Sequence, residues 1–137
     1  NMKKIVLFTA AMLLATNSYA GDGSLKEVMQ QLGSDYSDLG DAILWEDFDA
    51  AAEAAHAIAY HDKPSMGQRM KIMGTLGTEM LEFKKADGRV HDLALNIEEA
   101  ARAKDMPLLI QHQSRMLTAC MACHTTYRSR VIEALKQ

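Results

Sequence analysis

The chain has 137 residues, of which 48% are hydrophobic and 24% charged, with two cysteines and two prolines. This composition is typical of one globular domain and excludes collagen-like, low-complexity and disulfide-framework proteins. The formal charge of −3, without a run of basic residues, excludes a broad nucleic-acid-binding surface. Ten methionines against eight aromatic residues favour helices with an aliphatic and thioether core.

Residues 1–20 have the pattern of a secretory signal peptide. Two lysines precede an apolar stretch over residues 5–15, and Ser18-Tyr19-Ala20 offers a small-residue cleavage site. The stretch has 11 residues, fewer than the roughly 20 that a membrane-spanning helix needs. We therefore expect one mature domain, residues 21–137, exported to the periplasm, free of the membrane after cleavage and carrying a net charge of −5.

The first predicted helix of the mature chain covers Leu25 to Ile43. Ser24 and Glu27 form a capping box at its start, and apolar side chains then recur at helical intervals. This stripe comprises Leu25, Val28, Met29, Leu32, Tyr36, Leu39 and Ile43. We expect it to face the core.

A second helix is predicted from its N-cap, Asp47, to the stop at Lys63-Pro64. Its apolar face is narrow and rich in alanine, which implies close approach to a neighbouring helix. In residues 66–78 the methionines keep a helical interval, but three glycines each weaken a helix by about 1 kcal/mol relative to alanine. We expect a connection with some helix there.

Two further helices complete the pattern. The third runs from Thr78 to about Lys104, and Asp105 with Pro107 caps and starts the fourth. No strand-like alternation and no repeat period occurs in the mature sequence. The sequence therefore predicts an all-α fold, an antiparallel four-helix bundle on the order of 30 Å long.

One motif in the last helix carries chemistry. Cys120-Met121-Ala122-Cys123-His124 is C-x-x-C-H, the attachment signature of c-type haem. Two thiols three positions apart reach two vinyl groups of one porphyrin, and the adjacent imidazole turns onto the iron. A thioredoxin-like redox pair would need a helix N-terminus beside a strand, and a structural zinc site would need four ligands. The motif predicts one haem c, attached through Cys120 and Cys123, with His124 on the iron.

A family resemblance supports this prediction. The C-x-x-C-H followed by Tyr127 and Arg128 on a C-terminal helix resembles the class II c-type cytochromes, cytochrome c-prime and its low-spin relatives. The segment from Ser24 to Leu32 is similar to the first helix of the related bundle b-type cytochrome, in which a methionine at the position of Met29 binds iron. Relatives often carry an arginine early in this helix, where Leu25 stands here.

The sixth iron position decides between electron transfer and gas binding. By periodicity alone, Met29 either fills the core or binds iron. The resemblance to the low-spin relatives implies that Met29 is a ligand, with Leu25 and Leu32 beside the cofactor. The c-prime proteins instead leave the distal side apolar and the iron five-coordinate.

Two residues beyond the motif complete the expected haem site. Arg128 lies one turn after His124, where it either neutralises a haem propionate or remains a solvated cation near the helix end. We favour the propionate contact because Tyr127-Arg128 matches the family. The resemblance also implies that Tyr127 packs on the porphyrin edge.

The other histidines and methionines are interpreted without a role at the iron. Surface positions are expected for His56, His61 and His91, and His112 lies too far along the helix from His124 to share an iron. The methionines of the central segment also suggest a thioether copper site. Without a neighbouring Cys or His, core and loop packing is expected for Met66, Met70, Met73 and Met80.

These residues predict a periplasmic monohaem electron carrier with His124 and Met29 on the iron, and not an enzyme. Its partners would be redox proteins with basic patches that bind weakly; both monomer and homodimer are compatible with the sequence. The alternative is a five-coordinate, c-prime-like haem protein that binds nitric oxide or carbon monoxide. A peroxidase lacks support because no distal His and Arg pair can be placed.

Overall fold

The computed structural model describes residues 23–136, and the predicted signal peptide, residues 1–20, lies outside this range. Within it the chain is helical, with no strand, which confirms the all-α prediction. The elements are α1 (Leu25–Leu44), α2 (Phe48–Ala59), α3 (Met66–Leu76), the 3₁₀ turn η1 (Gly77–Glu79), α4 (Met80–Arg102) and α5 (Met106–Leu135). None of these described helices combines the length and apolar character needed to cross a membrane.

Side-chain caps fix where three of the helices begin. Ser24 Oγ accepts a hydrogen bond from the Glu27 N–H at 3.1 Å, and Asp47 and Asp105 carboxylates cap α2 and α5 at 3.0 and 3.1 Å. Each such cap typically stabilises a helix by about 1 kcal/mol. All three caps were predicted from the sequence and are confirmed.

Residues 66–76 form a full helix, α3, where the sequence predicted a connection with some helix. Ser65 caps it, and Ile72 and Leu76 are buried against α5. Most helical stability in proteins comes from packing of one apolar face, so this burial outweighs the cost of the glycines. The helix ends at Gly77, whose φ of 53° favours glycine.

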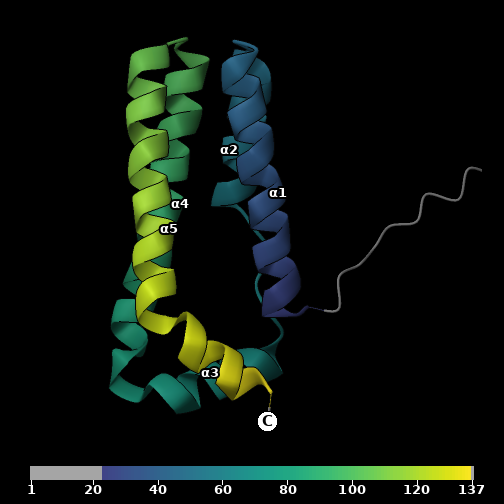
Figure 1. Cartoon of the computed structure of the whole chain (residues 1–137), viewed down its shortest axis with the longest axis vertical. Helices are drawn as coiled ribbons and strands as arrows, with labels where there is room; N and C mark the ends of the chain where they lie inside the picture. The colour runs from purple at the N-terminus through teal and green to yellow at the C-terminus, as the bar shows by residue number, and fades with distance from the viewer. Residues whose placement is uncertain (1–22, 137) are drawn as a thin grey trace, which may run out of the picture.

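Four long helices, α1, α2, α4 and α5, lie side by side along the longest axis, and α3 crosses one end (Figure 1). In chain order, α1 packs closely on α2, α2 on α4, and α4 on α5, whereas α1 and α5 approach each other less closely and meet through side chains such as Tyr36 and Gln113. Alanines such as Ala55, Ala94 and Ala101 are fully buried in the main core. Ala55 belongs to the narrow alanine face of α2 that the sequence indicated, and Ala94 and Ala101 belong to α4, which packs against it.

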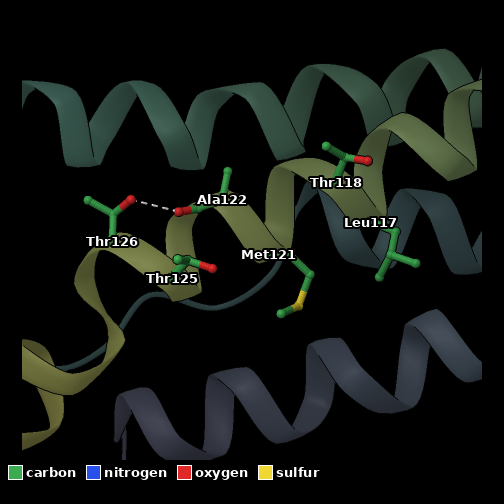
Figure 2. A pocket seen from close by; sticks show the side chains of 6 residues that line it. All are labelled: Leu117, Thr118, Met121, Ala122, Thr125 and Thr126. Atoms are coloured by element: carbon green, nitrogen blue, oxygen red, sulfur yellow. Dashed lines mark hydrogen bonds between the residues drawn. The ribbon is translucent and has the colours of Figure 1, made fainter.

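A second cluster of buried side chains closes the end where α3 lies. It joins Ile72 and Leu76 of α3 to Tyr127 and Val131 of α5. The ribbon of α5 bends beyond Thr126 (Figures 1 and 2), whose hydroxyl donates a 2.9 Å hydrogen bond to the Ala122 carbonyl. Hydroxyl bonds of this kind to the preceding turn often bend helices. The bend brings the last turns of α5 onto α3.

The start of α1 is tied to the start of α3 by one backbone–backbone hydrogen bond and one bond from a backbone amide to a side chain. The Ser65 N–H donates to the Gly23 carbonyl, and the Leu25 N–H donates to Gln68 Oε1, each at 2.6 Å. At the other end of α1 a tight turn leads into α2, with Glu46 in the left-handed region at φ 54°. Thus α1 is fixed at both ends and along α2.

Candidate functional site

The two thiols of the C-x-x-C-H motif lie midway along α5, between the two clusters. Cys120 packs against the main core and Cys123 against the second cluster, and both are half-buried and free of disulfide. Burial raises the pKa of both thiols, and the Asp87 carboxylate raises that of Cys123 further. Both side chains are therefore neutral thiols at neutral pH.

This setting differs from that of a catalytic redox pair. Reactive cysteines have a lowered pKa and commonly sit at a helix N-terminus, whereas Cys120 lies four turns into α5, which begins at Met106. Within residues 23–136, no group of three or more His, Cys, Asp and Glu side chains is arranged to hold a metal ion. These observations support neither a thioredoxin-like redox pair nor a structural zinc site.

His124 follows Cys123 directly and is half-exposed on α5. It lies one turn after Cys120, next to the inward face that carries both thiols. No described residue forms a hydrogen bond or ion pair with its ring. The imidazole is thus available as a ligand on the same stretch of helix as the thiols.

A hollow of about 520 Å³ lies along α5 beside the motif. Its lining consists of Leu117, Thr118, Met121, Ala122, Thr125 and Thr126. Figure 2 shows the side chains of Leu117 and Met121 projecting from α5 into the space between it and α1. They are 46% and 52% exposed, although both are large and apolar. The hollow is open to solvent, and its lining comes from α5 alone, without Cys120, Cys123 or His124.

Tyr36 shows which part of α1 faces the motif. Burial raises the pKa of its hydroxyl and nearby Cys120 raises it further, while a hydrogen bond to the Gln113 side chain lowers it. Tyr36 is therefore level with residues 113–120 of α5. The two helices run in opposite directions (Figure 1), and Met29 lies seven residues before Tyr36, about 10 Å along α1. The same displacement along α5 leads to residues 120–127, so Met29 is level with the motif.

Met29 itself is 41% exposed, so the prediction that it faces the core is wrong. On α1 the buried positions are Val28, Leu39 and Ala42, and the last two belong to the main core. The apolar stripe is wider than the surface that α2 covers. Met29 therefore lies at the edge of the apolar stripe, on the same side of α1 as Tyr36.

The other predicted site residues are placed as follows. Leu32 packs against the main core and Leu25 against the second cluster. Tyr127 is buried, and its ring lies edge-on to Phe83 with the centroids 5.3 Å apart. Arg128 is exposed, with no described partner. The structure thus brings Cys120, Cys123 and His124 together but seats Leu25 and Tyr127 in hydrophobic packing.

Sequence reasoning missed two features around the site. Arg130 binds both carboxylate oxygens of Glu79 at 2.8 and 2.9 Å and lies over the Tyr127 ring, a role the sequence did not suggest. Leu117 and Met121 were also missed as an exposed apolar pair. Their four-residue spacing outside the core stripe was the available signal.

The histidines away from the motif contact carboxylates. His56 is exposed as predicted, whereas His91 is partly buried and the His61 side chain is only 17% exposed, so the surface prediction is wrong for His61. The shortest nitrogen–oxygen distances are 3.0 Å for His56 and Glu98, 3.4 Å for His61 and Asp87, and 3.2 Å for His91 and Asp92. His112 differs, because its Nδ1 is buried without a hydrogen-bond partner.

No protein-family model, no curated protein and no solved structure matches this chain. What the site does has to follow from its own residues. These are the neutral thiols of Cys120 and Cys123 and the imidazole of His124, which has no described partner. The thioether of Met29 lies on α1 at the same height along the helix array.

Proposed function

We propose that this chain is a periplasmic c-type cytochrome that carries one electron at a time on a single haem c. The haem is joined to Cys120 and Cys123, and His124 is the proximal iron ligand. An antiparallel four-helix bundle holds the haem between α1 and α5. The observation that carries the proposal is the C-x-x-C-H motif on α5, on the side where α1 and α5 approach each other less closely than the other neighbouring helices do.

The residues present fit this group. Thioether formation replaces two half-buried thiols by neutral sulfurs, which suit the same apolar surroundings. A porphyrin would also cover the exposed apolar side chains of Leu117, Met121 and Met29, at about 25 cal/mol per Å² of surface removed from water.

When bound, the haem supplies the Fe(III)/Fe(II) couple, and the chain sets its ligands. A thioether from Met29 favours the softer ferrous state and raises the potential. Met29 lies at the same height along the helix array as the motif, and this position supports the ligation. Its position at the edge of the stripe supports the alternative, in which Met29 stays off the iron and the haem binds nitric oxide or carbon monoxide.

The charge distribution indicates the kind of redox partner. Residues 27–62, which include α2 and most of α1, contain nine acidic residues and no lysine or arginine. Such a surface favours partners with basic patches and makes encounter rates fall with salt. The protein would exchange electrons with these partners and transform no substrate of its own.

The direct test is covalent attachment. The parent, made in a host that exports and matures c-type cytochromes, should retain its haem through extraction with acidified organic solvent. The Cys120→Ala, Cys123→Ala double variant should lose it, whereas Met121→Leu, inside the same motif, should behave as the parent. Extraction of haem from the parent, or a parent without haem, would refute the proposal.

A further inference from the structure

The exposed face of α3 carries three methionines. Met66, Met70 and Met73 are 63%, 58% and 44% exposed. An adjoining side of the helix is fixed by Ile72 and Leu76, which are buried against α5. The prediction that these three methionines pack in the core or a loop is therefore wrong. Packing within the chain therefore does not explain why three methionine side chains lie together on this exposed face.

Their spacing places the three sulfurs within reach of one ion. Positions four and three residues apart lie on the same helix face, with about 5–6 Å between neighbouring Cβ atoms. Methionine has three rotatable bonds, so exposed thioethers can converge. Gly67 and Gly74 border this face, and a Cβ added at either would have nothing within 4 Å. The space beside the sulfurs is open.

The surrounding charges select the type of ion. Residues 63–78 contain no Asp or Glu, so a hard divalent cation finds no carboxylate ligand here. Arg69 and Lys71 lie on the same helix, and their repulsion of a divalent ion is twice that of a monovalent one. Thioethers prefer soft metals such as Cu(I). A soft ion with a single positive charge fits both conditions, and Cu(I) is such an ion.

We propose that Met66, Met70 and Met73 form a thioether site on α3 that binds one Cu(I) ion per chain. The site uses none of the residues assigned to the haem. It therefore stands or falls independently of the proposed electron-carrier function.

The experiment follows the methionine methyl groups. The parent protein and every variant carry Cys120→Ala and Cys123→Ala, so that no thiol competes for soft ions, and are labelled with ¹³C at the methionine methyls. Each is titrated with Ag(I) as a redox-inert soft cation. Cu(I) affinity is then measured by competition with a chromogenic Cu(I) chelator under reducing conditions. We expect the Met66, Met70 and Met73 resonances to shift together and saturate at one equivalent. The M66L/M70L/M73L variant should lose that equivalent, since leucine keeps volume and apolarity but removes sulfur.

Met106→Leu, at the start of α5, is the matched control and should bind as the parent does. Circular dichroism establishes that the triple variant is folded. Resonances of the three methyls that stay unmoved, or a triple variant that still binds one equivalent with parental affinity, would overturn the site. A triple variant that changes only the oligomeric state in sedimentation would identify a protein interface instead and equally overturn it.

Discussion

Replacing Met29 by alanine separates a ligand from a packing residue, because the two roles predict different effects. Met29 is 41% exposed, so about three fifths of its side chain is covered. Full burial of a methionine stabilises a protein by about 1.5–3 kcal/mol, so the partial burial here is worth about 1–2 kcal/mol. If Met29 only packs, Met29→Ala should lower the free energy of unfolding by that amount and leave the iron unaffected.

If the Met29 sulfur binds iron, the same substitution should change the electronic state of the haem. The ferric protein should pass from low-spin to high-spin, carbon monoxide should reach ferrous iron readily, and the potential should fall with the loss of the soft ligand. The structure supports this outcome because Met29 is level with the motif, although it is not in the core.

The assay is the ferric absorption spectrum of variant and parent, with denaturant unfolding measured on both. Met121→Ala is the matched control, since Met121 is a similarly exposed thioether on the opposite side of the same space (Figure 2). The control should keep the parental spectrum. A Met29→Ala spectrum identical to that of the parent would refute the ligation, and a high-spin parent would favour the gas-binding alternative.

Three further predictions concern the fold. Met116→Ala empties a fully buried position in the main core and should cost about 2–5 kcal/mol in denaturant unfolding; a loss below 1 kcal/mol would contradict the packing described. Ala55→Leu overfills the narrow α2 face and should cost about 1–3 kcal/mol by the same measurement. The His61–Asp87 hydrogen bond raises the pKa of His61 above its ordinary 6.5 and lowers that of Asp87 below 3.8. Its contribution is therefore present between about pH 4 and 6.5 and is lost as pH rises through the raised His61 pKa. The stability difference between the parent and His61→Gln should shrink above that pKa, and a constant difference from pH 5 to 9 would contradict this.

Features that depend on neighbouring residues in the sequence were predicted well. The caps at Ser24, Asp47 and Asp105 need only a side chain and a backbone amide three residues later. The alanine face of α2 is likewise local, because its alanines recur on consecutive turns of one short segment. The C-x-x-C-H motif is local too, so the candidate site could be named before the fold was known.

Features that depend on which surfaces meet were predicted poorly. Met29 and Met70 lie on apolar helical positions, which periodicity assigns to the core. Their exposure follows instead from the tertiary arrangement, in which α1 and α5 approach each other less closely than the other neighbouring helices and α3 crosses the end of the array. The helix of residues 66–76 was underestimated for a related reason, because its stability comes from burying Leu76 against α5 and not from its glycine-containing sequence.

The attachment of α1 has a consequence for how the chain moves. Lengthwise, α1 is held by α2, and its first turn is held by two hydrogen bonds to the α3 end, from Ser65 and to Gln68. Opening the first turns of α1 breaks those two bonds and exposes Leu25 and Val28, but it leaves the alanine core between α2 and α4 intact. Backbone amides at the start of α1 should thus exchange with solvent through a local, low-energy opening, while those of α2 and α4 wait for global unfolding. The first turns of α1 are therefore expected to open locally while the rest of the helix stays packed on α2.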